Sequence, residues 1–240
     1  MASICSDGSN GRASCRPAIG PKRIPGLTSA HLTFGRVRVT NGFDQFIPNA
    51  RAFLTELSRN NTRDWFVEHK AQFEADLKTP AMLLLDQIAH DLGKQTGANI
   101  DTKLFRQHRD LRFSKDKTPY NTHLHMLWNR RAGGRQDIGY FFGIAPDYVS
   151  VGVGLMAFDK PVLTDWRAAI DGPFGDQISA AIATALGSGA TLRDPDLKRV
   201  PSPYPSDHRH ATLLRRKGLS LWQDLNEKDY GDPAKALHCS

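Results

Sequence analysis

Residues 138–155 read Ile138-Gly-Tyr-Phe-Phe-Gly-Ile-Ala-Pro-Asp-Tyr-Val-Ser-Val-Gly-Val-Gly-Leu155. Two runs rich in β-branched and aromatic residues flank a turn-forming Ala-Pro-Asp sequence, and this pattern predicts a β-hairpin. Gly152 and Gly154 lie within the second run, where glycine indicates a close approach of other atoms to the strand rather than a phosphate-binding loop.

A second pair of strands is predicted immediately before this hairpin. Apolar and polar residues alternate over residues 103–113 and again over residues 122–129, with a Ser-Lys-Asp-Lys-Thr-Pro turn between them. Because alternate residues of a strand share a face, Arg106 and Arg112 are expected on one face and Arg109 on the other.

Helices are predicted on both sides of these strands. Asn61 or Thr62 can cap the second helix, and Pro80 can open the third, which ends at Gly93 or Gly97. Helical spacing of apolar residues covers residues 43–57, 65–77, 82–92, 162–170, 174–186 and 210–217. Helices, then a small antiparallel sheet with a central hairpin, then helices define an α+β fold.

The ends of the chain differ from its body. The 240 residues carry a net charge of +7, and residues 1–40 are basic, so we expect a disordered N-terminal extension before a single globular domain of residues 41–240. The only cysteines are Cys5, Cys15 and Cys239, which excludes a disulfide in the core and favours a cytoplasmic location. No run approaches the roughly 20 apolar residues of a membrane span, so no membrane partner is expected.

Positive charge within the body is concentrated in two islands. Residues 103–135 hold nine Lys or Arg against Asp110 and Asp116, and residues 197–217 hold six against Asp207. The rest of the body is acidic, and such sorting by position indicates anion-binding surfaces. If the fold brings the islands together, they form one basic cleft.

The first island suggests a clamp for an anion. Arginine forks suit phosphate and carboxylate oxygens, and lysines add point charge. The alternative is structural pairing of these cations with the acidic remainder of the chain. The candidate ligand-binding residues of this island are Arg106, Arg109, Arg112, Lys115, Lys117 and Tyr120.

The second island adds a candidate catalytic residue, His208. Histidine titrates near neutral pH and can act as a general acid or base beside a phosphate. The alternative is helix chemistry, in which Asp207 caps a helix and cations such as Arg216 complement the dipole at its end. The candidate ligand-binding residues here are Lys198, Arg199, Arg215 and Lys217.

Three histidines form a candidate metal site. His123 and His125 share a strand face, and His108 on the neighbouring strand can supply a third ligand. Surface or packing histidines are the alternative, because no nearby carboxylate completes the set. The chain also lacks the common phosphate-loop, dinucleotide, nucleophile-elbow and zinc-helix motifs, so we expect no cofactor.

Several ordered motifs resemble those of one family. They are Asn60-Asn-Thr-Arg-Asp-Trp-Phe-Val-Glu-His-Lys70, the segment from Phe105 to Tyr120, Gly152-Val-Gly-Leu155, Leu197-Lys-Arg-Val-Pro and Asp207-His-Arg-His-Ala-Thr-Leu-Leu-Arg-Arg-Lys217. From residue 42 to about residue 225, the chain resembles the domain of unknown function 2461 (DUF2461) family. The resemblance implies a compact soluble domain and assigns no activity.

Two positions and the end of the chain depart from the family pattern. Asn121 stands where the family has lysine after Pro-Tyr, and Arg209 stands where it has proline after Asp-His. The family pattern continues with another helix beyond Ser240, so we expect a truncated or altered C-terminus.

Three functions follow from these patterns. The first is binding of a small phosphate- or carboxylate-bearing ligand in a basic cleft, with or without metal-free transfer or hydrolysis assisted by His208. The second is nucleic-acid binding, in which Trp128 stacks on bases while Arg130, Arg131 and Arg135 follow phosphates. The third is a protein interaction domain whose arginines form only structural ion pairs.

Overall fold

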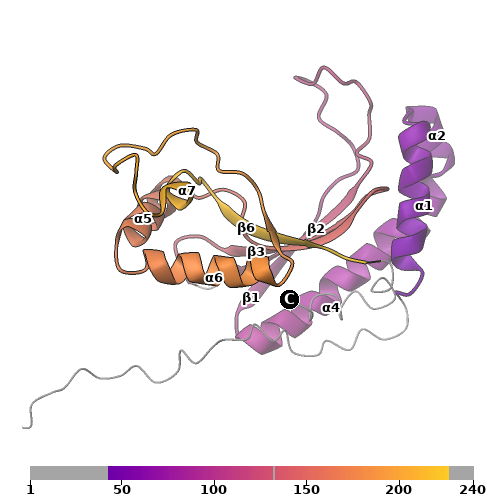
Figure 1. The fold of residues 1–240 in the computed structure, drawn as a ribbon. Helices are drawn as coiled ribbons and strands as arrows, with labels where there is room; N and C mark the ends of the chain where they lie inside the picture. The colour runs from indigo at the N-terminus through magenta and orange to yellow at the C-terminus, as the bar shows by residue number, and fades with distance from the viewer. Residues whose placement is uncertain (1–42, 132, 227–240) are drawn as a thin grey trace, which may run out of the picture. The chain divides into compact units, whose positions relative to one another are not determined.

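The structure, a computed structural model, describes residues 43–131 and 133–226 (Figure 1). Its elements are α1 (Phe46–Arg59), α2 (Arg63–Glu68), α3 (Lys70–Phe73), the π-helical turn η1 (Glu74–Lys78), α4 (Thr79–Thr96), β1 (Asn99–Leu104), β2 (Leu124–Arg131), β3 (Ile138–Ile144), β4 (Val149–Leu155), α5 (Lys160–Asp171), α6 (Gly175–Gly187), β5 (Thr191–Leu192), α7 (Ala211–Leu214) and β6 (Leu219–Asp224). The strands form one antiparallel sheet in the order β1-β2-β3-β4-β6-β5. This arrangement confirms the predicted α+β class.

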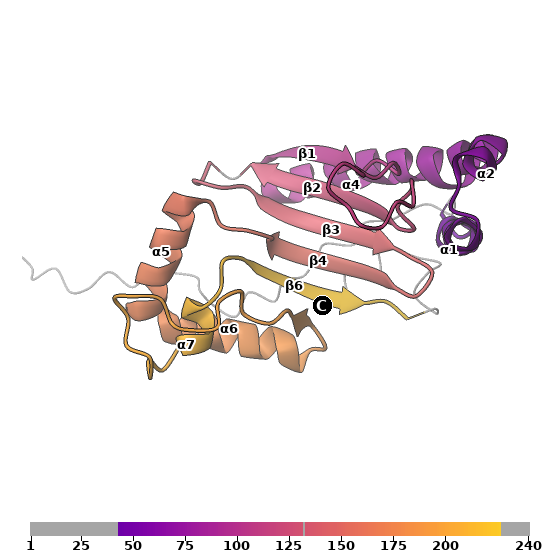
Figure 2. The same cartoon turned by 90° about the horizontal axis from the view of Figure 1, so that it is seen from above.

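The predicted hairpin occupies the centre of the sheet. β3 and β4 pair from Gly139 opposite Gly154 to Ile144 opposite Val149. Figure 2 shows the hairpin between β2 on one side and β6 on the other. The sequence pattern therefore located both central strands within one residue of their observed ends.

The N-terminal helices bury one face of the sheet. Successive side chains of a strand point to opposite faces, and Met126, Trp128 and Phe142 all lie buried on the face that packs against α4 and α1. The Trp128 indole donates a hydrogen bond to the Leu85 carbonyl at 2.9 Å, so this large side chain is anchored to α4 without an unsatisfied polar atom. Figure 1 shows α4 below the strands.

The opposite face of the sheet is called the open face below. It carries the alternate residues of the same strands, among them Leu127 and Phe141, which stand opposite each other on β2 and β3. Figure 2 looks onto this face, where β3 and β4 lie in view with no described helix over them.

The second predicted helix is divided rather than continuous. Thr62 caps its start, as expected, by accepting a hydrogen bond from the Trp65 backbone N–H at 3.4 Å. The helix breaks at His69, whose imidazole pairs with the Trp65 carbonyl at 2.8 Å and competes with the helical ladder. The expected stop before Pro80 was wrong, because η1 leads directly into α4, where proline in the first turn removes no helical hydrogen bond.

The first predicted strand was largely wrong. β1 spans Asn99–Leu104 instead of residues 103–113, so only Lys103 and Leu104 of the predicted strand belong to it, although these two residues pair with β2 as expected. Beyond this point the ladder is reduced to an isolated bridge between His108 and Tyr120. Side chains reinforce it: the Gln107 amide donates to the Asn121 carbonyl, and the Asn121 amide donates to the Arg106 carbonyl at 3.1 Å. The residue 105–113 segment is therefore a loop, and the predicted facing of its arginines does not apply.

The C-terminal half contains a second, smaller core. Ile170, Ile182 and Leu214 are buried between α5, α6 and α7. The helix expected over residues 210–217 is restricted to α7, and β6 was not predicted at all. A strand of six residues has little local signal, and β6 is defined by its pairing with β4.

Two expectations fall outside the described residues: the basic N-terminal extension and the altered C-terminus. The division of the chain into an extension and a single domain therefore stays a prediction. Within residues 43–131 and 133–226, no helix is long and apolar enough to cross a bilayer.

Adjacent leucines on α4 test which face of this helix carries the core. Leu84 is fully buried, whereas Leu83 is 58% exposed. We expect Leu84→Ala to lower the free energy of unfolding by about 2–5 kcal/mol, because it leaves a cavity, and Leu83→Ala to change it by less than about 1 kcal/mol. Urea denaturation of both variants measures the difference, and equal losses would contradict the observed packing.

Candidate functional site

The loop that joins β1 to β2, residues 105–123, frames the candidate site and is called the basic loop below (Figure 1). Asn121 donates its backbone N–H to the Gln107 carbonyl at 2.7 Å, and Arg109 donates its own to the Pro119 carbonyl at 2.9 Å. These bonds hold the two arms of the loop together. Residues from both arms can therefore line one space.

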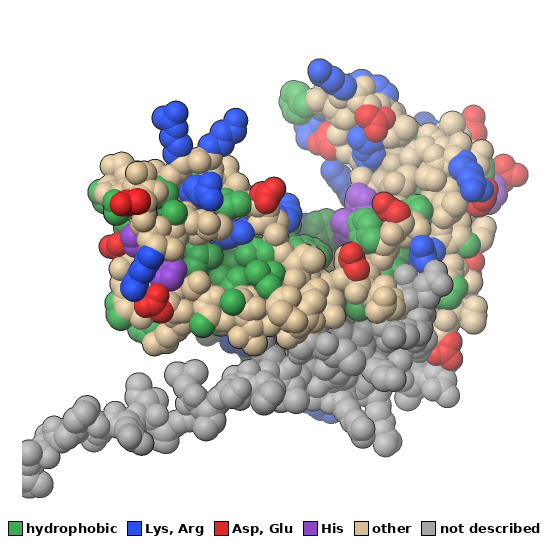
Figure 3. Space-filling model, viewed as in Figure 1, with side chains coloured by type: hydrophobic (Ala, Val, Ile, Leu, Met, Phe, Trp, Pro, Cys, Tyr) green, Lys and Arg blue, Asp and Glu red, His purple; other side chains and the backbone are tan. Residues whose placement is uncertain are grey.

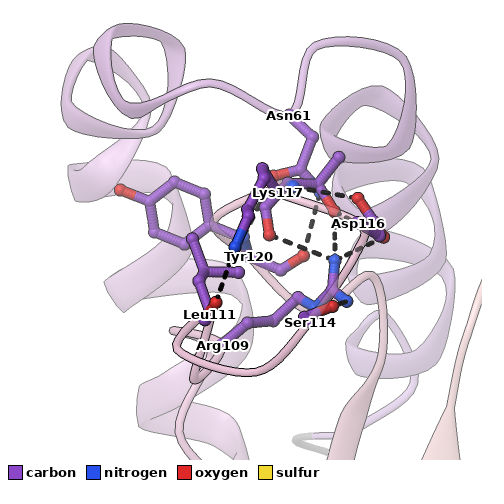
Figure 4. Close-up of polar contacts among 8 residues, drawn as sticks. Asn61, Arg109, Leu111, Ser114, Asp116, Lys117 and Tyr120 are labelled. Carbon is purple, nitrogen blue, oxygen red and sulfur yellow. Dashed lines mark hydrogen bonds and ion pairs between the residues drawn. The ribbon is translucent and has the colours of Figure 1, made fainter.

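Asn61 anchors the basic loop to the turn between α1 and α2 (Figure 4). Its side-chain amide donates to the Tyr120 carbonyl at 2.9 Å, and its oxygen accepts from the Tyr120 N–H at 3.1 Å. The Tyr120 ring is 3% exposed and stacks on Phe66 with centroids 4.1 Å apart. Tyr120 therefore belongs to the core, and its predicted contact with a ligand has no support in its position.

Arg109 closes the tip of the basic loop on itself (Figure 4). Its guanidinium lies 2.5 Å from the Asp116 carboxylate, and it also donates to the Thr118 carbonyl, the Thr118 hydroxyl and, at 3.3 Å, the Ser114 hydroxyl. The Thr118 backbone N–H and then Arg109 lower the pKa of Asp116 to about 2. Structural pairing, the alternative interpretation of the first island, thus accounts for much of what Arg109 does.

Arg112 and the lysines of the loop point into solvent. Arg112 is 78% exposed on its side chain and forms a fork with Asp110 at 2.6 Å, which lowers the pKa of that carboxyl. Lys117 donates to the Leu111 carbonyl at 3.0 Å, and Lys115 is exposed. Arg112, Lys115 and Lys117 do not line the pocket described next, so the predicted clamp is smaller than expected.

A pocket of about 360 Å³ lies beside the basic loop. Two predicted arginines and all three histidines of the first island contribute to it, and the guanidinium of one of them, Arg106, forms no hydrogen bond or ion pair with any described residue. The lining residues are Phe105, Arg106, His108, Arg109, Asp110, Ser114, Asn121, His123 and His125.

His123 and His125 bring neutral imidazoles to this pocket. Their rings stack with centroids 4.0 Å apart, and the His125 Nε2 atom lies 2.8 Å from the Tyr148 hydroxyl. Burial, and then the nearby charge of Arg109, lowers the pKa of His123. Burial, and then His123, lowers the pKa of His125 from 6.5 to about 4. Each ring can therefore donate one N–H to a bound oxygen at neutral pH.

The histidines were predicted as candidate metal ligands, and the structure does bring His108 to the same pocket. Over the described residues, however, no three His, Cys, Asp or Glu side chains are arranged to hold a metal ion. Arg106 and Arg109 line the same pocket, and their positive charge favours binding of an anion over a cation.

His208 lies away from the pocket. Its Nε2 atom is 3.3 Å from the Asp171 carboxylate, and its Nδ1 atom accepts the backbone N–H of His210 at 3.0 Å. The Nε2 atom therefore holds the chain before α7 against the end of α5, while the Nδ1 atom stabilises the local turn into α7. This geometry matches the structural interpretation of the second island better than the catalytic one.

The other residues of the second island are divided by burial. Lys198, Arg199 and Lys217 are exposed, and Arg215 donates to the Thr212 hydroxyl at 3.4 Å. Arg216, assigned from the sequence to a helix end, is instead buried.

Arg216 follows a helix of only four residues and donates to the Arg193 carbonyl at 2.6 Å. Its burial lowers the pKa of the guanidinium, against the opposing effect of Asp196 and Asp194. The role of this arginine is therefore to tie the residue 193–196 segment to the core.

The two islands lie on opposite sides of the open face. Figure 2 places the basic loop over the β1 and β2 side and the residues before α7 beyond β6. Figure 3 shows a hollow between these walls, each with Lys and Arg side chains (blue), and histidine (purple) within the hollow. One pocket is lined by residues of the first island, and a second, smaller pocket is lined by Arg216 of the second island, so a single cleft between the islands stays a prediction.

Comparison with known proteins identifies the family. A match to the DUF2461 family, described as conserved hypothetical proteins, spans residues 49–238. The chain therefore belongs to this family, as its motifs predicted. Neither the curated proteins nor the solved structures contain a match to the chain.

Two groups that shape the pocket were not found from the sequence. Asn61 lies far from the basic loop along the chain, and Tyr148 lies in the turn of the central hairpin. The local signal, the alternation of His123 and His125 on one strand, indicated a shared face and a candidate metal site, and it included neither Asn61 nor Tyr148.

The Asn61 anchor can be tested with an isosteric change. Asn61→Asp keeps the acceptor for the Tyr120 N–H but places a carboxylate against the Tyr120 carbonyl, so we expect the free energy of unfolding to fall by about 1–3 kcal/mol. Asn60→Asp is the matched control, because Asn60 is exposed and its amide donates only to Glu56. Urea denaturation should show a loss well below that of Asn61→Asp for the control.

The lowered pKa of His125 predicts a specific acid sensitivity. The unfolded chain binds a proton near pH 6.5 and the folded chain only near pH 4, so the free energy of unfolding must fall as the pH falls through this window. We expect His125→Gln, which keeps a partner for Tyr148, to reduce that loss by about 1 kcal/mol, a value discounted for partial exposure. Denaturation at pH 7 and pH 4.5 measures it, and an unchanged loss would contradict the burial of this ring.

Proposed function

We propose that this protein binds a small phosphate- or carboxylate-bearing ligand in the pocket beside the basic loop. The observation that carries the proposal is Arg106, which lines the pocket and whose guanidinium forms no hydrogen bond or ion pair with a described residue, while Arg109 and Arg112 have carboxylate partners. A free guanidinium at a concave site offers two parallel N–H donors to an oxyanion.

The histidines support the same ligand class. A neutral imidazole N–H donates to an anion without the large desolvation cost of a second buried cation. An anion at this position would also raise the pKa of His123, because opposite charge favours the protonated ring. His123 lines the pocket and is placed to exchange a proton with a bound phosphate, should transfer or hydrolysis occur there. His208, the catalytic residue predicted from the sequence, lies away from the pocket.

The nucleic-acid-binding alternative loses support from the same geometry. Trp128, expected to stack on bases, is buried against α4. Arg131 is paired with Asp101 at 2.5 Å, and Arg135 is paired with Asp165 at 3.1 Å. A cationic track for a nucleic-acid backbone would need these side chains free, so a small ligand fits better. A cytoplasmic location stays part of the proposal.

Two arginines of the basic loop provide a matched test. Thermal-shift screening of the full chain against phosphate, sugar phosphates, nucleotides and organic acids should find an anion that raises the melting temperature by about 5–10 °C at a hundred times its dissociation constant. We expect Arg106→Ala to weaken binding of that anion about 10–100-fold and Arg112→Ala to change it less than about 2-fold.

Other outcomes separate the remaining functions. Equal losses in both variants, together with a steep fall in affinity with salt, would indicate a diffuse cationic surface for nucleic acid. Absence of any shift across the screen would contradict the proposal and favour an interaction domain with structural ion pairs.

A further inference from the structure

Four aromatic rings lie flat over glycines on the open face. A β-carbon at Gly152 would lie 2.7 Å from the Cε3 atom of Trp222, and one at Gly139 would lie 2.6 Å from the Cζ atom of Phe141. At Gly143 it would lie 3.1 Å from the Cδ2 atom of His125. The glycines therefore leave space that the rings occupy.

The fourth ring, that of Tyr148, also covers Gly143, where a β-carbon would lie 3.2 Å from its Cε2 atom. These four rings, from Phe141, Trp222, His125 and Tyr148, are called the aromatic platform below. All four are partly exposed. Rings that lie along the sheet instead of standing upright present their faces, rather than their edges, to what lies above.

The register of the strands joins the platform into one surface. Phe141 stands opposite Gly152, and Gly152 stands opposite Trp222, so the two large rings meet across the glycine with centroids 5.3 Å apart and planes at 29°. His125 stands opposite Gly143, two residues along β3 from Phe141. Neighbouring rows on one face are about 7 Å apart along the strands.

His125 also lines the anion pocket, so the platform and the pocket adjoin. On the pocket side, Lys103 adds positive charge, with its ammonium 4.7 Å from the centre of the Phe105 ring. Asp224 stands in the same row as Ser150 and Gly143, where it opposes a second anion.

Because the pocket and the platform adjoin, an anion that carries a planar ring is favoured over a simple anion. A simple organic acid or inorganic phosphate would fill the pocket and leave the partly exposed rings in water. A ligand with a planar ring joined to its anionic group would cover both, since aromatic faces attract other π-systems and exclude water. One anionic end and one flat apolar end is the chemistry of a nucleoside phosphate.

We infer that the ligand of the proposed anion pocket is a small nucleoside phosphate, with its base on Phe141 and Trp222 and its phosphate at Arg106 and His123. The inference rests on the proposed function and adds the part of the ligand that the pocket alone does not specify. A single nucleotide, rather than a strand, is favoured because Arg131, a cation of the open face beyond the pocket, is paired with Asp101 and is not available to a second phosphate.

A graded ligand series tests the inference on the full 240-residue chain. Calorimetric titrations would compare inorganic phosphate, ribose 5-phosphate, adenosine and the four nucleoside 5′-monophosphates. We expect at least one monophosphate to bind about 10-fold or more tightly than ribose 5-phosphate, because base stacking adds to the phosphate contact. Adenosine should bind more weakly than its phosphate.

Single variants test which residues provide the stacking of the base and which provide the contact with the phosphate. Trp222→Leu and, separately, Phe141→Leu should remove most of the advantage of the monophosphate while leaving ribose 5-phosphate within about 2-fold. Arg106→Ala should weaken both ligands. Phe174→Leu is the matched control, since Phe174 is an exposed aromatic at the start of α6, away from the platform.

The outcomes distinguish this inference from the proposed function. If ribose 5-phosphate binds and no monophosphate binds more tightly, the anion pocket stands and the nucleoside phosphate is ruled out. If none of the phosphates binds, the inference is wrong, and the proposed function itself fails as well unless an organic acid of the thermal-shift screen binds. If only oligonucleotides bind, with affinity that falls steeply between about 50 and 200 mM salt, the platform serves a nucleic-acid strand and the inference is wrong. These results come from the unaltered protein, so they hold even if a variant fails to fold.

Discussion

Burial of one sheet face against α4 is the constraint on which the rest of the structure depends. Trp128 enters this core and its indole donates to the Leu85 carbonyl at 2.9 Å, which sets the position of β2 relative to the helix. Because side chains alternate along a strand, the same register places Leu127 and His125 on the opposite face. The composition of the open face is therefore a direct consequence of how the core is packed.

Competition for acidic partners decides which cations remain for a ligand. The first island looks strongly basic in the sequence, yet Asp116 engages Arg109 and Asp110 engages Arg112 within the same loop. Only Arg106 lines the pocket without such a partner in the described part of the chain. A count of charges thus overstated the clamp, because local acids satisfy most of the arginines that surround them.

Partial desolvation then sets the chemistry of the pocket. It lowers the pKa of His123 and His125, so these rings are neutral donors at physiological pH rather than further cations. Their position also links two environments, since His125 belongs both to the pocket and to the flat rings over the glycines of β3 and β4. Charge recognition and stacking are consequently adjacent on one surface.

The sequence by itself determined the α+β class, the central hairpin, a helix cap at Asn61 or Thr62 and the family, because each depends on local periodicity, turn residues or ordered motifs. Only the tertiary structure decided β6, the end of β1 and the separation of the two islands, since these depend on pairing between segments distant in the chain. The candidate site is divided in the same way. The sequence alone indicated that arginines and histidines are its candidate residues. Which of them are buried, paired or free is set by contacts such as that of Asn61 with Tyr120, which no local pattern encodes.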